Sequence, residues 1–317
     1  MLNVALELST IGLSQSGEGN GKNKTGLFRV GTELTKALLA IPGIRYHFFF
    51  WAYPHVSKFG IQYFKERGFK VDQLFANSPL EKFIYQQLFD SNKIPKNHSL
   101  MRIASRIFKA CKHPALPNHL EVYHSFYYPL PNFINPKSTI RFRTIHDLTP
   151  LLFPETFKEA HRKKFLRGIR KISKKQDWFF AVSNHTKRDF CEHLKVPEER
   201  VFVTHLAASR KNFHAVNDQT QIQSVKEALN IPDKPYLLSL ATLEPRKNLR
   251  FTIRVFKKFI RESSDDHDVT LVLVGRKGWL IDNLLNDIGN DAILKKRVVL
   301  TGFVPDFMLA PLLSGAV

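Results

Sequence analysis

Cysteine is the scarcest residue in this chain, with two among 317 residues. Two thiols cannot build the disulfide framework on which small secreted domains depend, so the sequence favours a reducing compartment. No uninterrupted apolar run reaches the roughly 20 residues of a membrane-spanning helix. The first ten residues, MLNVALELST, lack a basic start and a long apolar stretch, and we therefore expect no signal peptide.

Acidic residues are also few, because 28 Asp and Glu stand against 48 Lys and Arg, giving a net charge of +20. Such a charge favours anionic partners, namely nucleic acid, anionic lipid surfaces or phosphorylated substrates, without choosing among them. A hydrophobic content of 43% with 12% aromatic residues excludes a disordered chain. The length allows about two domains with sizeable cores.

Two common site motifs are missing. A P-loop ending at Lys22 would need glycine where Ser16 stands and a hydroxyl residue where Asn23 stands. What remains is a glycine-rich loop at residues 12–25, with Gly26 at the start of the next helix. This loop either approaches a ligand with its backbone or is a mobile surface loop. No His, Cys, Asp and Glu spacing resembles a zinc site.

Runs rich in β-branched and aromatic residues alternate with helix-period segments, which predicts an α/β protein with parallel sheets. In the first part of the chain we expect strands at Leu2–Leu8, Ile44–Trp51, Glu121–Tyr127, Thr139–Ile145, Trp178–Val182 and Arg200–Leu206. Three more strands follow between Tyr236 and Val304. Polar residues 207–224 form the best linker, so the expected domains are residues 1–210 and 211–317.

A basic helix is predicted at Lys158–Lys175, where nine Lys and Arg accompany one Glu. The pattern of Thr156 followed by Glu159 is typical of a capping box at its start. Apolar residues at helical spacing within it either pack into a core, leaving a solvated basic face, or help the helix to meet anionic lipid or an acidic acceptor. Ser183 is placed to cap the helix that follows the fifth strand.

The most informative segment is Glu244–Asn248, which follows the first strand of the second domain and precedes a helix. Ligands of open α/β sheets bind at the carboxyl ends of strands, and a helix start attracts anions. Arg246 can bind two oxygens of a phosphate, and Lys247 can add a point charge. The segment is therefore either a phosphate or diphosphate site or a solvated basic turn.

His146 follows the fourth strand at the corresponding edge of the first domain. A histidine there could donate to a substrate hydroxyl or phosphate, although a single histidine in this position is often structural. His124, at the end of the preceding strand, raises the same question with less support.

Several short segments give the chain a resemblance to the family 4, or group 1, glycosyltransferases. They are Thr25–Arg29, Tyr123–Ser125 with Tyr127–Pro131, His146–Pro150 with Phe153–Glu155, Ala181–Asn184, Glu244–Asn248, Val274–Trp279 and Thr301–Val304. Each is modest alone, but seven in the family's order make the match specific. The resemblance implies the GT-B architecture of two Rossmann-like, doubly wound lobes that face a cleft.

The resemblance also implies transfer of a sugar from a nucleotide-sugar donor, with retention and with no metal or other cofactor. Arg246 and Lys247 would hold the donor diphosphate and neutralise charge on the leaving group. Gly26 would let its loop close over the reacting groups, and His146 would meet the transferred sugar. Phe303 and Val304 would lie beside the nucleotide base.

The chain departs from the family pattern in two places. Where the family has Gly-Arg after the first strand of the second lobe, this chain has Ala241-Thr242, so Arg246 and Lys247 carry more of the phosphate binding. The family's next strand, acidic glycine-rich loop and Glu-x7-Glu element do not follow Ser314–Ala316. We therefore expect a second lobe that is incomplete and a transferase that is C-terminally truncated, with poor activity by itself.

These patterns predict a glycosyltransferase that acts on a glycan or lipid-linked acceptor in the assembly of a surface polysaccharide or glycolipid. The expected location is cytoplasmic, with peripheral contact at the anionic inner face of the membrane. The alternative is a degenerate, non-catalytic nucleotide-binding protein with a basic, membrane-associating surface. A nucleic-acid-binding role would explain only the charge, and no specific nucleic-acid partner is expected.

Overall fold

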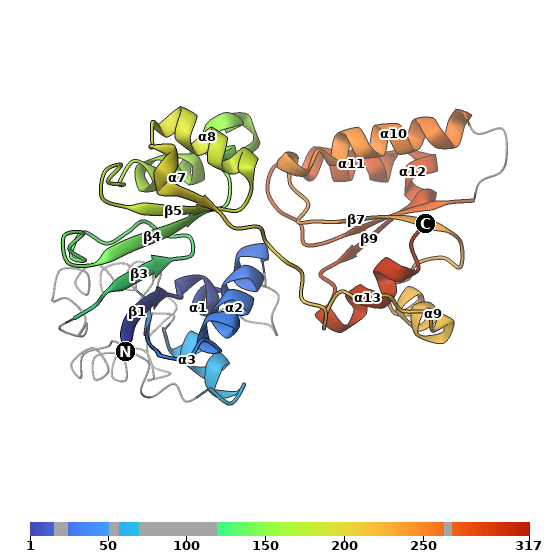
Figure 1. Cartoon of the computed structure of the whole chain (residues 1–317). Helices are drawn as coiled ribbons and strands as arrows, with labels where there is room; N and C mark the ends of the chain where they lie inside the picture. Colours follow the sequence, from blue (N-terminus) through green and yellow to red (C-terminus); the bar gives the residue numbers. More distant parts are fainter. Residues whose placement is uncertain (16–24, 51–56, 70–118, 263–267) are drawn as a thin grey trace, which may run out of the picture. The chain divides into compact units, whose positions relative to one another are not determined.

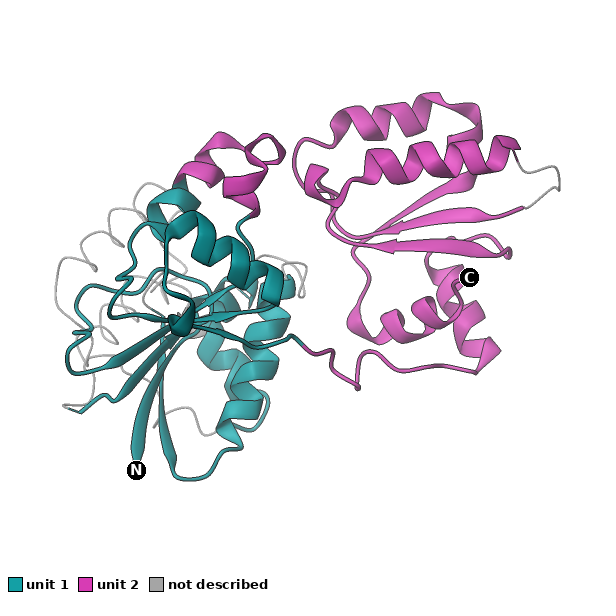
Figure 2. Ribbon diagram, turned by 45° about the horizontal axis from the view of Figure 1, so that its top comes forward, with its two compact units in different colours: residues 1–148, 164–206 teal, residues 149–163, 207–317 magenta. Residues whose placement is uncertain are grey.

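The computed structural model describes residues 1–15, 25–50, 57–69, 119–262 and 268–317 (Figure 1). These residues form two compact units, one made of residues 1–148 and 164–206 and the other of residues 149–163 and 207–317 (Figure 2). The division after residue 206 lies close to the domain boundary at residue 210 that we expected. The assignment of residues 149–163 to the second unit is not foreseen by the sequence.

The first unit is built on a parallel sheet in the order β2-β1-β3-β4-β5-β6. Its strands are β1 (Leu2–Glu7), β2 (Ile44–Phe49), β3 (Val122–Ser125), β4 (Ile140–Ile145), β5 (Trp178–Ala181) and β6 (Val201–Val203). After β1 the chain builds β2 on one side and β3 on the other. The strand order therefore reverses beside β1, and loops at the carboxyl ends of β1 and β3 flank a topological switch point of the kind that binds ligands.

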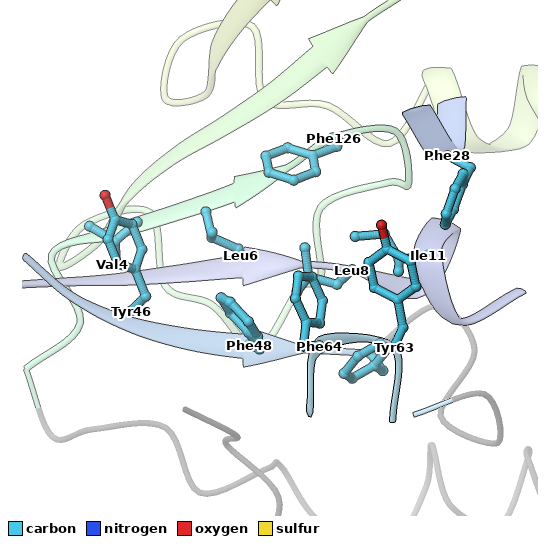
Figure 3. Close-up of a cluster of buried hydrophobic side chains, with 11 residues drawn as sticks. Val4, Leu6, Leu8, Ile11, Phe28, Tyr46, Phe48, Tyr63, Phe64 and Phe126 are labelled. Atoms are coloured by element: carbon cyan, nitrogen blue, oxygen red, sulfur yellow. The ribbon is translucent and has the colours of Figure 1, made fainter. Parts of the chain in front are cut away.

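Helices α1 (Ser9–Gln15), α2 (Gly26–Leu39) and α3 (Ser57–Lys65) pack against one face of β1 and β2. The core between them is aromatic, and it takes alternate residues of the strands, such as Leu6 and Phe48, as a strand period of two requires (Figure 3). The rings of Phe48 and Phe64 lie 5.0 Å apart. The helix α1 corrects our expectation of a loop from residue 12, since Gly12 is helical; residues 16–24 of that loop lie outside the described residues.

The rest of the first unit contains α8 (Asn184–Leu194) and the 3₁₀ turn η4 (Glu198–Arg200). The expected cap is confirmed, because the Ser183 hydroxyl accepts a hydrogen bond from the Thr186 amide at 3.0 Å. Phe190 of α8 is buried against Phe179 of β5, with ring centroids 4.8 Å apart. This helix thereby covers the β5 and β6 side of the sheet.

The second unit has a parallel sheet of β7 (Tyr236–Leu240), β8 (Thr270–Val274) and β9 (Val298–Gly302), with β8 in the middle. Helices α10 (Leu249–Glu262), α11 (Asp282–Asn290) and α12 (Ala292–Arg297) cover one face (Figure 1). Helices α9 (Gln219–Ala228) and α13 (Asp306–Ser314) cover the other. All five residues of β8 are buried, because the central strand is covered on both faces.

Segment 149–163 contains α6 (Thr149–Leu152), the 3₁₀ turn η3 (Pro154–Thr156) and the first part of α7 (Glu159–Ile169). The predicted capping box is wrong, because Thr156 ends η3 and its hydroxyl donates to the Phe153 carbonyl at 2.8 Å. The basic helix is also shorter than the expected Lys158–Lys175. The expected linker, residues 207–224, overlaps α9, which Asp218 caps through the amides of Thr220 and Gln221.

Within the part of the chain that the structure describes, no helix combines the length and apolar character needed to cross a bilayer.

Candidate functional site

The carboxyl ends of β7, β8 and β9 lie at one edge of the second unit's sheet, because the three strands are parallel neighbours. Three loops leave this edge, after Leu240, Val274 and Gly302. Arg246 and Lys247 lie in the first loop, and Phe303 and Val304 lie in the third. The four residues predicted from the sequence for donor binding thus share one sheet edge.

Backbone pairing continues beyond the strands and fixes the first two loops to each other. The Ala241 amide donates to the Val274 carbonyl at 2.9 Å, and the Gly278 amide donates to the Leu243 carbonyl at 2.8 Å. Gly275 has φ +142°, and a Cβ there would lie 1.8 Å from the Ala241 carbonyl oxygen. Only glycine fits this approach, so Gly275 is what allows the loops to pack together.

Glu244 is the residue of this loop that the sequence analysis missed. Its carboxylate is buried, with 2% of the side chain exposed, and it accepts a hydrogen bond from the Arg246 guanidinium. Arg246 is 31% exposed, so part of its side chain stays accessible. A charge-assisted bond to a buried carboxylate orients Arg246 before any ligand arrives. An acidic residue two positions before a predicted phosphate-binding arginine was the available signal.

Lys247 and the start of α10 complete the first loop. Pro245, Arg246 and Lys247 form the 3₁₀ turn η5, and Asn248 follows in the left-handed conformation at φ 51°. The helix begins at Leu249, whose side chain is buried in the core and anchors the helix start. Lys247 is exposed. The structure thus places an exposed cation directly before a helix N-terminus, where the helix dipole also favours an anion.

The third loop offers one accessible side chain of the two that we expected. Gly302 has φ +70°, which turns the chain at the end of β9. Phe303 is half-buried, whereas Val304 is 4% exposed and packs in the core with Leu309. The Val304 side chain therefore serves the core, and Phe303 is the residue of this pair that a planar base could contact.

The second loop joins segment 149–163 to the sheet edge through Trp279. The Trp279 indole Nε1 donates to the Thr156 carbonyl at 2.8 Å, and its ring lies 5.7 Å from that of Phe157 and 6.2 Å from that of His161. Nearby, Lys277 pairs with Asp282 at 2.5 Å and holds the pKa of that carboxyl below its usual value. Trp279 explains why this segment belongs with the second unit, a link that its sequence pattern did not indicate.

His146 lies at the carboxyl end of β4 in the first unit and is half-buried. Its Nε2–H donates to the Phe126 carbonyl at 2.8 Å. Burial lowers the pKa of His146, so the ring is neutral near pH 7. Because Nε2 carries the hydrogen, Nδ1 is an acceptor. The neutral ring can thus accept a hydrogen bond from a ligand hydroxyl, whereas we had expected it to donate one.

His124 is a structural histidine in this arrangement. It is buried, its Nε2 lies 2.9 Å from the Thr144 hydroxyl, and burial lowers its pKa to about 3. The rings of Phe126 and Phe180 lie 4.7 and 5.2 Å away. An aromatic enclosure of this kind favours the neutral ring and gives it no role toward a ligand.

Gly26 is the first residue of α2, as expected, and Thr25 caps the helix through the Phe28 amide at 3.4 Å. Among the described residues, no atom lies within 4 Å of a Cβ placed at Gly26. The local backbone therefore does not demand glycine there. Gly31, one turn further along α2, packs against Phe126, whose carbonyl binds His146, so α2 and His146 belong to the same neighbourhood.

Among the residues that the structure describes, no group of three or more His, Cys, Asp or Glu side chains is arranged to hold a metal ion.

The curated proteins and solved structures described below, which resemble this chain, are mannosyltransferases and other glycosyltransferases. No protein-family model matches the chain. The serotype-specific mannosyltransferase WbdA of Escherichia coli is 25% identical over 177 residues, which are 54% of this chain and 21% of WbdA. The O-antigen chain mannosyltransferase B of Escherichia coli is 23% identical over 198 residues, 62% of this chain and 51% of that protein. The chain thus spans between a fifth and a half of these relatives.

Two solved structures resemble the chain over nearly its whole length. WaaG, a glycosyltransferase involved in lipopolysaccharide biosynthesis, has a TM-score of 0.53 at 12% identity, over 100% of this chain and 73% of WaaG. A glycosyltransferase from Rickettsia africae ESF-5 has a TM-score of 0.50 at 14% identity, over 99% and 71%. Together with the two parallel sheets, this likeness confirms the predicted fold class, an α/β protein with the Rossmann-like units of the GT-B glycosyltransferases.

Proposed function

We propose that this protein is a glycosyltransferase that moves a sugar from a nucleotide-sugar donor to a glycan or lipid-linked acceptor, with retention of configuration. The observation that carries the proposal is the Glu244–Asn248 loop at the carboxyl edge of the second sheet. There Arg246 is oriented by buried Glu244, and exposed Lys247 stands before α10. The mannosyltransferase relatives support sugar transfer over other uses of a diphosphate site.

In this proposal the donor diphosphate binds at the loop. Lys247 contributes a mobile point charge, Arg246 a preset planar donor, and the start of α10 the positive end of its dipole. As the sugar leaves, negative charge grows on the nucleoside diphosphate, and fixed cations stabilise that charge most in the transition state. Thr242 stands where the resembling family has a third cation, so Arg246 and Lys247 supply the charge by themselves.

We further propose that His146 accepts a hydrogen bond from a sugar hydroxyl through Nδ1. The Phe126 carbonyl fixes the ring in the required tautomer. Phe303 supplies a partly exposed ring for the nucleotide base, and Gly26 leaves space for close approach at the start of α2. Burial keeps His146 neutral through the physiological range, which suits an acceptor.

The relatives make mannose the first donor sugar to test and a bacterial surface polysaccharide the first acceptor class. Such assembly would take place on the cytoplasmic side of the membrane. We also propose that transfer needs no metal, because Arg246 and Lys247 neutralise the diphosphate. Rates measured with and without a chelator test this, and a loss of rate that Mg²⁺ restores would contradict it.

The deciding experiment is calorimetry with UDP, GDP and ADP, followed by transfer assays with the matching sugar donors. Lys247→Met should weaken binding of the preferred nucleoside diphosphate by roughly 1.5–3 kcal/mol, the range for a hydrogen bond to a charged group. Lys296→Met is the matched control, since it removes an exposed lysine of α12, the helix that leads into the amino end of β9.

Three results are distinguishable. Nucleotide binding that depends on Lys247, together with transfer, supports the full proposal. Binding that depends on Lys247 without transfer or donor hydrolysis supports the alternative, a non-catalytic nucleotide-binding protein, for which the missing cation at Thr242 is the supporting observation. Equal binding by the Lys247 and Lys296 variants would rule out the loop as the diphosphate site. The anomeric configuration of the product, read by NMR, tests retention.

A further inference from the structure

Helix α10 exposes an apolar stripe on the side that faces away from the sheet. Phe251, Val255 and Phe259 are 51%, 47% and 43% exposed. They recur every four residues, so they lie one above another on the same face of the helix. Large apolar side chains in water normally occur singly, and a row of three marks a surface that meets another apolar phase.

This stripe is not part of the fold's own core. The opposite side of α10 carries Leu249, Ile253 and Phe256, which are buried against β8, α11 and α12. These three anchor the helix to the sheet. Because these buried residues anchor α10, we expect the unit to stay folded when the exposed stripe is replaced.

Exposed cations lie beside the stripe. At 100° per residue, Arg254, Lys258 and Arg261 fall on the flank next to Phe251, Val255 and Phe259. The Arg254 guanidinium lies over the Phe251 ring at 5.3 Å. The other charges on the exposed side are Arg250 and Glu262, and Glu262 lies 3.7 Å from Lys258. Lys257 pairs with Asp291 and is committed to the fold.

We propose that the exposed face of α10 lies on an anionic lipid bilayer. Aromatic residues insert at the boundary between headgroups and acyl chains, and flanking arginines and lysines meet the lipid phosphates. A protein partner would need about 800 Å² on each side for a stable interface, far more than three side chains supply. A nucleic acid would use the cations but not the apolar stripe. The combination favours lipid.

The lipid contact proposed on α10 differs from the basic segment Lys158–Lys175, for which the sequence left open a core-packed helix or a lipid-facing one. In that segment Ile169 of α7 is 1% exposed, and Phe165 and Ile172 are half-buried. Its apolar stripe is thus largely covered, whereas Lys171, Lys174 and Lys175 are exposed. An interfacial helix needs both components on the surface, and α10 presents both. This inference does not depend on the proposed sugar transfer.

The test is co-sedimentation of the full chain with vesicles of phosphatidylcholine alone and of phosphatidylcholine mixed with phosphatidylglycerol. Binding should require the anionic lipid and weaken as salt rises. A variant with Phe251→Ser, Val255→Ser and Phe259→Ser should bind the mixed vesicles at least about tenfold more weakly. Its control, Phe307→Ser with Leu313→Ser on α13, removes exposed apolar residues elsewhere in the same unit and should bind like the unmodified protein.

A second pair of variants separates position from net charge. Changing Arg254, Lys258 and Arg261 to Gln should weaken binding about a hundredfold, because each cation near an anionic surface contributes about a fivefold factor. Changing the exposed Lys171, Lys174 and Lys175 to Gln removes the same charge from the basic segment and should have a much smaller effect. Circular dichroism melts show which variants are folded.

Equal losses in the two charge variants would overturn the proposal, because binding would then follow net charge alone. Unchanged binding of a folded α10 apolar variant would overturn it as well. So would vesicle binding that is the same for neutral and anionic lipid, or protein that binds random DNA but not vesicles.

Discussion

Replacing Arg246 should damage both folding and ligand binding, whereas replacing its neighbour Lys247 should damage binding alone. The two residues are adjacent cations in the same turn, and from sequence they are equivalent. The structure separates them, because Arg246 is the partner of a carboxylate that is 2% exposed. Arg246→Met leaves that Glu244 carboxylate buried without its partner, while Lys247→Met changes an exposed side chain.

The size of the effect follows from the burial of the pair. Removing one member of a fully buried ion pair costs about 3–5 kcal/mol, because a charge is left desolvated. Arg246 is 31% exposed, so water already screens part of this pair. We therefore expect Arg246→Met to lower the free energy of unfolding of the second unit by about 2–3 kcal/mol. Lys247→Met should change it by less than about 0.5 kcal/mol.

Urea unfolding followed by tryptophan fluorescence and circular dichroism measures the difference, since Trp279 lies in the second unit. The double variant Glu244→Gln with Arg246→Met supplies the decisive control. It removes the buried charge together with its partner, so it should recover much of the stability lost in Arg246→Met while nucleoside-diphosphate binding stays weak. Equal stability of the two single variants would refute the argument that Glu244 holds Arg246 in a buried pair.

Three further predictions concern the first unit. Burial lowers the pKa of His124 from its usual 6.5 to about 3, so the neutral ring stabilises the fold above pH 6.5 and this contribution is lost as pH falls toward 3. A few kcal/mol should be lost by about pH 4.5. His124→Phe should flatten that part of a denaturation profile, and identical acid profiles would contradict the burial argument. His146→Gln keeps a donor for the Phe126 carbonyl, so it should lower turnover more than stability. His146→Ala removes that donor and should also lower the free energy of unfolding by about 1 kcal/mol. An Ala variant with normal turnover would show that His146 takes no part in the reaction. Gly26→Ala should leave the melting temperature equal or slightly higher, because the described residues leave space for a Cβ there and alanine favours helix. A fall in turnover without loss of stability would show that a ligand approaches Gly26. Unchanged kinetics would show that no ligand does.

The strands were predictable because their signal is local. Every predicted strand coincides with one of β1 to β9, since buried parallel strands are continuous β-branched and aromatic runs whatever they pack against. The cap at Ser183 was predictable for the same reason, because the cap residue and the amide that it binds are three positions apart. The loop with Arg246 and Lys247 also lies where the pattern of strand, loop and helix predicts it.

The errors arose where a side chain had two possible partners or two possible environments. Thr156 could cap a helix or close the preceding turn, and Pro154 favours the turn because it starts a 3₁₀ helix. Val304 lies in the predicted loop, but a valine after a strand can also turn into the core, as it does beside Leu309. Asp218 made a helix start inside the polar stretch that we took for a linker.

The pairing of Glu244 with Arg246 was beyond the sequence for a different reason. The spacing of the two residues is visible, but an exposed pair at that spacing would matter little. What gives it weight is burial, and burial comes from the neighbouring loop after β8. There a Cβ at Gly278 would lie 3.2 Å from the Glu244 Cβ, so the loop lies directly against this side chain.

The position of the candidate phosphate-binding cations is therefore set by residues that need not touch a phosphate. Gly275 lets the Ala241 carbonyl come close, and this approach allows Leu243 to pair with the loop after β8. That pairing buries Glu244 against Gly278, and buried Glu244 orients Arg246. A site assembled in this way holds Arg246 in place before the ligand arrives, so less ordering has to be completed on binding. Lys247 is exposed and has no carboxylate partner among the residues that the structure describes, so its side chain can follow a diphosphate whose charge shifts as the sugar departs.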